Sequence, residues 1–292
     1  MKYYCKLCGA ELTKENRCSA HIIPEFIWRE YMINEAGEKE DMILLKKDNQ
    51  PPRFLKKYGI TDDGILCRKC DDELLGKYEN AFREVWERVF KNGKLYPVEK
   101  DGKLYGWAKE IVGHEDIIKT KLFLLCCIWR ASISALEDYP FKLNGRKENA
   151  IKKILLSGNY GKLVYTYETM CSKFEDSDFP IVSVPYLDKI KGKKLSLVRL
   201  FLPKGYLFSM RIGLEPIDKK FKPAVFGSMK NAFFVVNMGK MEESATEENF
   251  MKNAIKALRN MYYGDKKKVR KGLMKKYNDV TEEEINTALK IE

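Results

Sequence analysis

The chain has 292 residues, of which 45% are hydrophobic and 33% are charged, and its formal net charge is +12 at pH 7. This composition is typical of a globular protein with one large or two modest domains and excludes a disordered chain. The apolar run of residues 122–128, which Arg130 soon ends, is far shorter than the roughly 20 residues that cross a bilayer. The N-terminus has no apolar signal region, so we expect a cytoplasmic protein without membrane contact. Its excess of lysine and arginine favours a nucleic-acid partner.

Taken in chain order, the first predicted element is a short helix after Pro24, because proline suits the start of a helix. Residues 34–58 are polar and interrupted by prolines, which indicates an insertion loop. Apolar residues at three- and four-residue spacing over residues 71–90 predict an amphipathic helix. Three glycines and a proline within residues 91–106 indicate a linker or an exposed hairpin.

A second helix is predicted over residues 116–136, and it is apolar almost all round, so it should lie at the centre of a core. Arg130 lies within it and needs a partner, because an unpaired buried guanidinium is costly. An ion pair with a carboxylate is favoured here over a contact with a phosphate.

The rest of the chain is predicted to combine a sheet with further helices. β-branched and aromatic runs over residues 162–240 predict an antiparallel sheet, with one hairpin turning at residues 203–205. Capping-box spacings predict helices over residues 245–291. The predicted fold class is therefore α+β, with residues 93–292 forming a C-terminal domain of helices and antiparallel sheet.

Two CxxC pairs, Cys5 with Cys8 and Cys67 with Cys70, stand out among the eight cysteines. In an intracellular chain such pairs are metal ligands more often than disulfides. Four thiolates complete the tetrahedral coordination of a structural Zn²⁺ and leave no open position for catalysis. The sequence therefore predicts a zinc site that stabilises the fold.

The segments "CKLCG", "AHIIPEF" and "GILCRKCDDELLGKYENAF" together resemble the zinc-stapled branch of the HNH, or ββα-metal, endonuclease family. In that family one strand ends in a histidine followed by "IIP", and a second strand leads into a CxxC pair where a helix begins. The resemblance covers about residues 1–92 and implies an N-terminal HNH-like module. It also implies metal-dependent hydrolysis of phosphodiester bonds, in DNA more than in RNA. The remainder of the chain resembles proteins of prokaryotic genomes that are often encoded beside phage-defence or mobile elements, which suggests a defence or mobile-element effector.

The resemblance also implies roles for individual residues. His21 matches the general base that deprotonates the attacking water. Asp71, directly after Cys70, matches a ligand of a catalytic Mg²⁺ or Mn²⁺, and oxygen ligands suit such hard ions. Asp62, five residues before Cys67, stands where the family has the asparagine that orients the base.

The sequence departs from the family pattern at several positions. Ala20 precedes His21 where the family commonly has Asp, Glu or His, so one expected metal ligand is missing. Glu25 or Asp72 is the candidate replacement. The middle asparagine and the final asparagine or histidine of the motif are both aspartate here. These changes indicate either a rearranged one-metal site or an inactive nuclease that has kept the zinc fold for binding.

Several alternatives remain open at this point. His21 is either the general base, a zinc ligand or a hydrogen-bonded histidine of the fold. Cys18 is expected to pack as a small buried residue, and His114 is expected to lie in a loop or at a helix cap. The nuclease hypothesis leads. Its main rival is a non-catalytic zinc-binding module that recognises nucleic acid or a partner protein. A third hypothesis is an effector whose C-terminal domain senses a small ligand. Whether the protein forms a homo-oligomer stays open.

Overall fold

The computed structural model describes residues 2–29, 42–44, 53–55, 59–100, 103–110, 113–136, 141–158, 167–174, 182–189, 196–212, 225 and 232–238. The chain divides into two compact units, one of residues 1–42 and 54–240 and the other of residues 43–53 and 241–292. The helices predicted over residues 245–291 lie outside the described residues, as does most of the predicted insertion loop. Within that loop, β4 (Met42–Leu44) and β5 (Arg53–Leu55) pair in a two-stranded sheet.

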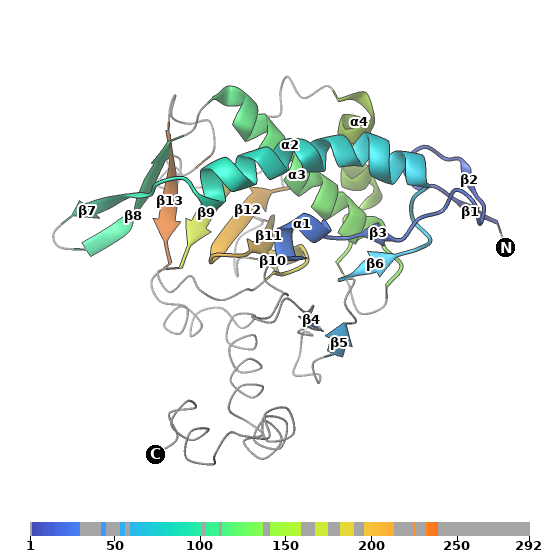
Figure 1. Cartoon of the computed structure of the whole chain (residues 1–292), viewed down its shortest axis with the longest axis horizontal. Helices are drawn as coiled ribbons and strands as arrows, with labels where there is room; N and C mark the ends of the chain where they lie inside the picture. The colour runs from blue at the N-terminus through green and yellow to red at the C-terminus, as the bar shows by residue number, and fades with distance from the viewer. Residues whose placement is uncertain are drawn as a thin grey trace, which may run out of the picture. The chain divides into compact units, whose positions relative to one another are not determined.

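The N-terminal region consists of two short pairs of strands, one short helix and one long helical run (Figure 1). Its elements are β1 (Tyr3–Tyr4), β2 (Glu11–Leu12), β3 (Ala20–His21), α1 (Glu25–Trp28), β6 (Thr61–Asp62), the π-helical η2 (Lys69–Leu75), α2 (Gly76–Val85) and the π-helical η3 (Trp86–Lys91). β1 pairs with β2, and β3 pairs antiparallel with β6. The run from η2 to η3 confirms the helix predicted over residues 71–90, and Tyr78, Phe82 and Phe90 of its apolar face are buried.

Two further helices follow, α3 (His114–Ile133) and α4 (Gly145–Ser157). α3 confirms the central helix predicted over residues 116–136, although it ends at Ile133 because Ser134 adopts an extended conformation. The pattern analysis did not predict α4. Its start is fixed by the Asn144 side chain, which accepts a hydrogen bond from the Lys147 amide, and its end by Gly158 in the left-handed conformation.

A seven-stranded sheet has the strand order β10-β11-β12-β9-β13-β8-β7. Its strands are β7 (Tyr96–Lys100), β8 (Lys103–Glu110), β9 (Thr169–Lys173), β10 (Tyr186–Lys189), β11 (Ser196–Leu202), β12 (Tyr206–Arg211) and β13 (Ala232–Asn237). All neighbours are antiparallel except β13 and β9. The hairpin predicted at residues 203–205 is confirmed, with Lys204 and Gly205 both at positive φ. The residues predicted as a linker or hairpin form β7 and part of β8, so the sheet starts well before residue 162.

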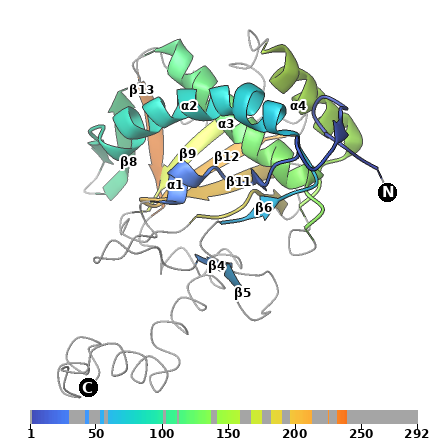
Figure 2. The same ribbon diagram turned by 45° about the vertical axis from the view of Figure 1, so that its right-hand side comes forward.

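Helices α2 and α3 cover the sheet on one face (Figures 1 and 2). Phe82 on α2 stacks on Phe123 of α3 with 4.0 Å between ring centroids. Trp86 and Phe90 meet Tyr206 on β12 edge-on, at 6.1 and 5.4 Å. Buried residues on both sides of positions 92 and 93 thus belong to one hydrophobic cluster, and the division into domains there stays a prediction. The arrangement confirms the α+β fold class.

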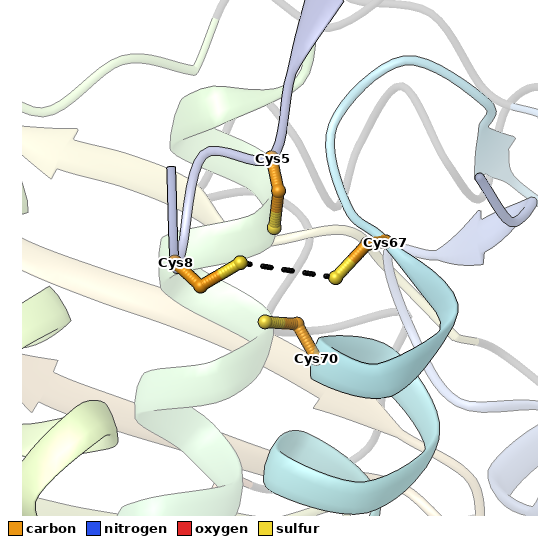
Figure 3. Close-up of side chains that lie close together, drawn as sticks. All are labelled: Cys5, Cys8, Cys67 and Cys70. Atoms are coloured by element: carbon orange, nitrogen blue, oxygen red, sulfur yellow. Dashed lines mark hydrogen bonds between the residues drawn. The ribbon is translucent and has the colours of Figure 1, made fainter. Parts of the chain in front are cut away.

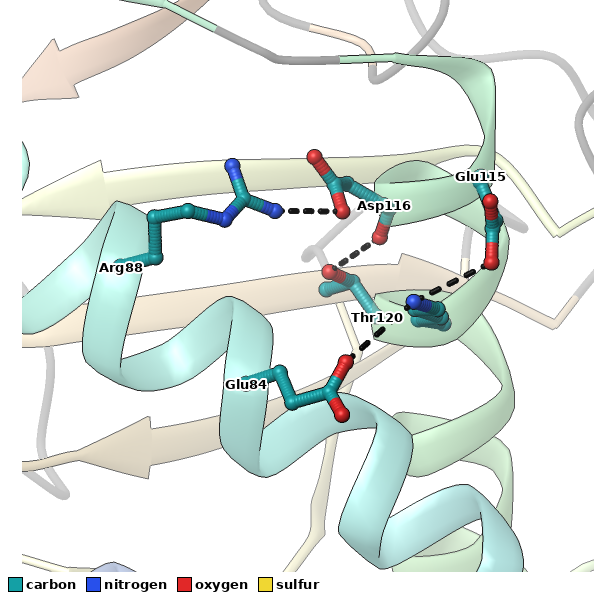
Figure 4. A network of polar contacts seen from close by, with 6 residues as sticks. Glu84, Arg88, Glu115, Asp116 and Thr120 are labelled. Atoms are coloured by element: carbon teal, nitrogen blue, oxygen red, sulfur yellow. Dashed lines mark hydrogen bonds and ion pairs between the residues drawn. The ribbon is translucent and has the colours of Figure 1, made fainter.

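Polar contacts join the same helices at the start of α3 (Figure 4). Arg88 donates to the Asp116 carboxylate at 2.8 Å, and Thr120 donates to the Asp116 carbonyl at 2.8 Å. The Lys119 ammonium lies 3.6 Å from Glu84 of α2. The two ion pairs between the helices are partly exposed, so each contributes little to stability. In the described part of the chain, none of the helices combines the length and apolarity needed to cross a membrane.

Candidate metal centre and adjoining cavity

The four cysteines of the CxxC pairs come together in the structure (Figure 3). The sulfur atoms of Cys5, Cys8, Cys67 and Cys70 all lie within 4.8 Å of one another, and those of Cys8 and Cys67 are 3.8 Å apart. A tetrahedral site with Zn–S bonds of about 2.3 Å places its sulfurs about 3.8 Å apart. The cluster is therefore compatible with a structural metal ion such as zinc.

Backbone hydrogen bonds build the first CxxC turn and join it to the second. The Cys5 amide donates to the Ala10 carbonyl at 2.8 Å, and the Gly9 amide donates to the Cys5 carbonyl at 2.9 Å. Gly9 has φ of +80°, a conformation that glycine adopts without strain. The Lys6 amide donates to Ile65 at 2.9 Å, just before the second pair. Two segments far apart in sequence thus present their thiols to one point.

The thiols differ in their acidity. Burial raises the pKa of Cys67 and of Cys70. Burial acts in the same direction on Cys5, but backbone hydrogen bonds from Cys8, Cys67 and Leu7 outweigh it and lower the pKa of Cys5 to about 7. Because metal ions bind thiolates, loading this site must displace protons from the buried thiols.

A cavity of about 630 Å³ is lined by residues from three parts of the fold. The segment from β3 to α1 contributes His21, the helical run from η2 to α2 contributes Asp71 directly after Cys70, and α3 contributes Arg130. The structure therefore brings together the residues predicted as general base and as metal ligand. Glu25 and Asp72, the candidates for the missing ligand, also line this cavity.

A buried ion pair fixes the inner side of the cavity. Arg130 is only 2% exposed, and its guanidinium donates to Asp71 Oδ1 at 2.6 Å and to a carboxylate oxygen of Glu79. Burial opposes the charge of Arg130, but Glu79 and Asp71 outweigh that effect and raise its pKa. The ion pair predicted for Arg130 is thus confirmed, and its partners are now identified.

His21 lies on β3 at the edge of the cavity and is half-buried. Backbone pairing with Thr61 on β6 holds its strand, and its ring centroid lies 6.0 Å from that of Trp28 on α1. Trp28 in turn packs against Gly59, where a Cβ atom would approach the indole to 2.5 Å. His21 is not part of the four-cysteine group, nor is Cys18, whose thiol donates to the Leu66 carbonyl.

Asp62 faces a different part of the fold. Its carboxylate is buried and accepts hydrogen bonds from the Ser134 hydroxyl and the Ala135 amide, both at 2.9 Å, and from the Gly64 amide at 3.0 Å. Asp62 is not among the residues that line the cavity. These contacts attach β6 to the end of α3, and the role of Asp62 in orienting His21 stays a prediction.

Several residues of this cavity were not predicted from the sequence, among them Arg29 and, on α2, Glu79, Asn80 and Arg83. The position of Arg130 in an apolar helix predicted a carboxylate partner. The sequence could not identify that carboxylate, because several acidic residues in the chain met the requirement equally well. The other histidine, His114, is the exposed first residue of α3 and does not line the cavity.

Comparisons of the chain with protein-family models, with curated proteins and with solved structures found no match. What the site can do must therefore be argued from its own groups. Those groups are a cluster of four thiols that is compatible with a metal ion and a polar cavity with one imidazole, four carboxylates and three guanidinium groups.

Proposed function

We propose that the protein is a metal-dependent nuclease that hydrolyses phosphodiester bonds, with DNA favoured over RNA as substrate, and that Zn²⁺ is the ion of its cysteine cluster. One observation carries the proposal. His21 on β3 and Asp71 in the first turn of the helix after β6 line the same cavity, and Asp71 directly follows Cys70 of the cluster. Two antiparallel strands followed by a helix, with these two residues facing one space, support the ββα-metal assignment.

The chemistry assigned to His21 is that of a general base. A neutral imidazole has a proton affinity suited to accepting the proton of an attacking water near neutral pH. His21 is half-buried and its strand is held by backbone pairing, so its ring is positioned before substrate arrives. In this role it removes a proton from water while the water oxygen attacks phosphorus.

The charges in the cavity favour a divalent cation. Four carboxylates (Glu25, Asp71, Asp72 and Glu79) face three guanidinium groups (Arg29, Arg83 and Arg130), so 4 − 3 leaves one negative charge. Carboxylate oxygens suit Mg²⁺ or Mn²⁺, and Mg²⁺ is usually held by one or two carboxylates together with substrate phosphates. When bound, such an ion polarises the phosphate and stabilises the leaving oxygen. Asp71 and Asp72 are the residues assigned to hold it.

A second candidate function is a non-catalytic zinc-binding module that recognises nucleic acid or a partner protein. One observation favours it. Asp71 is already engaged by Arg130, and within the described residues only the four cysteines have their ligand atoms gathered for a metal ion. A site that has lost its catalytic ion would retain this arrangement.

The nuclease proposal is tested by His21→Ala in zinc-loaded protein, with supercoiled plasmid DNA and single-stranded RNA as substrates and added Mg²⁺ or Mn²⁺. Loss of a general base should reduce the cleavage rate about a hundred- to ten-thousandfold, with zinc content and melting temperature unchanged. His114→Ala is the matched control, because it removes the other histidine outside the cavity, and it should cleave like the wild type.

Two outcomes would overturn the assignment. If the wild type cleaves neither nucleic acid with any divalent ion, the binding module becomes the better function. If His21→Ala loses zinc and unfolds, the histidine belongs to the fold. Asp71→Ala should also lose cleavage, but a higher concentration of Mg²⁺ or Mn²⁺ should partly restore it, since that residue is assigned to the ion.

A further inference from the structure

The three arginines that line the cavity differ in their partners. Arg29 lies 3.8 Å from Glu25, and Arg130 is paired with Asp71 and Glu79. Arg83 has no carboxylate partner within the described part of the chain. Among the described residues, it is therefore the arginine of this cavity without a carboxylate at ion-pair distance.

Arg83 is nevertheless held in place. Its guanidinium carbon lies 4.8 Å from the centroid of the Phe26 ring on α1. Phe26 itself contacts Phe123 of α3 at 6.0 Å, and Phe123 stacks on Phe82 in the core. A guanidinium above a ring is attracted to the ring face, and its N–H donors stay available around its edge. The core thus positions a cation with unused donors.

The chemical class of ligand follows from this geometry. A guanidinium carries five N–H donors in a planar fork that matches two oxygens of a phosphate. Asn80 lies three residues before Arg83 on α2, lines the same cavity and is exposed, so its amide offers a further donor. Both side chains share the cavity with His21 and Asp71. A phosphate held here would lie in the space that the proposed reaction requires.

We propose that Arg83, supported by Phe26 and assisted by Asn80, is the phosphate-binding group of this cavity, and that its ligand is the phosphodiester backbone of a nucleic acid. That the ligand is a nucleic acid rests on the proposed nuclease function. The phosphate site itself rests only on the guanidinium of Arg83, which Phe26 holds in place and which has no carboxylate partner among the described residues. Arg83 binds the phosphate in the cavity that His21 and Asp71 also line.

The test is the affinity of zinc-loaded full-length protein for a short fluorescein-labelled DNA duplex, measured by fluorescence anisotropy over a range of salt concentrations without added Mg²⁺. Arg83→Ala should weaken binding about tenfold, as expected for a charged hydrogen-bonding contact. It should also reduce the log–log salt slope by about one. Arg83→Lys keeps the charge but loses the fork, so it should keep the slope and show intermediate affinity.

Arg146→Ala is the matched control, because Arg146 is exposed on α4 and does not line the cavity. It should leave both the affinity and the slope unchanged. A parallel titration with inorganic phosphate, read by thermal shift, tests the phosphate site without any nucleic acid. The wild type should be stabilised and Arg83→Ala should not.

The outcomes separate this proposal from the nuclease assignment. Reduced binding by Arg83→Ala in a protein that never cleaves supports the phosphate site and overturns the nuclease. Normal binding and cleavage by Arg83→Ala supports the nuclease and overturns the phosphate site. If the wild type binds neither the duplex nor inorganic phosphate, the phosphate site is also overturned. Because Arg83 is exposed, the variant should fold normally, which a thermal melt will check.

Discussion

The cysteine cluster and the cavity beside it meet at Cys70 and Asp71, yet they are built in different ways. Each half of the cluster is a local turn with a fixed spacing, and four sulfur atoms already face one point. The cavity takes its groups from β3, from η2 and α2, and from α3, and two of its arginines are already paired with acids. Each half of the cluster thus depends on a local turn, whereas the cavity takes its groups from separate elements that pack together.

This contrast separates the residues that hold the site in place from the residues that face the cavity. The residues that position the site, such as the cysteines, Arg130 and Asp62, are mostly buried and have identified partners. Other residues that face the cavity, such as Asp72 and Arg83, are exposed. We therefore expect substitutions in the first group to lower stability and substitutions in the second to change binding or catalysis alone.

The largest effect is expected from breaking the cluster with Cys67→Ser. Structural zinc binding contributes on the order of 10–16 kcal/mol in zinc-finger peptides, and losing one ligand should remove several kcal/mol of it. Elemental analysis should find little zinc, and circular dichroism should record a much lower melting temperature. Cys18→Ser is the control, because its hydroxyl can still donate to Leu66 and the thiol is outside the cluster. Full zinc content in Cys67→Ser would contradict the cluster as the metal site.

The next largest effect is expected for the ion pair inside the cavity. Arg130→Met leaves the carboxylates of Asp71 and Glu79, which are 14% and 19% exposed, without their cation. Removing one partner of a buried pair costs about 3–5 kcal/mol, measurable by urea denaturation. Arg88→Met breaks the pair with Asp116, in which the arginine is 45% exposed, and should cost less than about 1 kcal/mol. Equal losses for the two variants would show that burial of Arg130 does not matter.

A smaller loss of stability is expected at the contacts that attach β6 to the end of α3. Asp62→Ala removes the acceptor for the Ser134 hydroxyl and the Ala135 amide, which should cost about 1–3 kcal/mol in the free energy of unfolding. Its exposed neighbour provides the control, since Asp63→Ala removes only an exposed hydrogen bond from the Ser19 hydroxyl and should cost less than about 1 kcal/mol. If Asp62→Asn keeps its melting temperature but loses cleavage, Asp62 acts on His21 in addition to holding the strand.

The smallest effect on stability is expected for Asp72→Asn. Asp72 lines the cavity, but its side chain is exposed, so the free energy of unfolding should change by less than about 0.5 kcal/mol. Asp71→Asn, one residue earlier, weakens the contact with Arg130 and should cost more. Isothermal titration with Mn²⁺ then compares the two as ligands of the proposed ion. Unchanged Mn²⁺ binding in both variants would exclude them from that role.

The sequence predicted the features that depend on local spacing. The CxxC pairs, the amphipathic helix over residues 71–90 and the turn at residues 203–205 each follow from neighbouring residues. The partner of Arg130 could be foreseen as a carboxylate only, because Asp71 and Glu79 reach it through the packing of α2 against α3. Strand order could not be predicted, since the pairing partners of a strand depend on its tertiary neighbours more than on its own residues.

The position of β13 has a consequence for how the chain is made. β13 lies between β8 and β9, although it is synthesised after both of them and after β10, β11 and β12. Until it emerges from the ribosome, the β7–β8 hairpin and the group formed by β9 to β12 each present an unpaired edge. Exposed edges of this kind recruit other chains and cause aggregation. Joining the two halves across so long a separation in sequence is also slow. A nascent chain stalled before Ala232 should therefore be insoluble, and one released after Asn237 should be able to close its sheet.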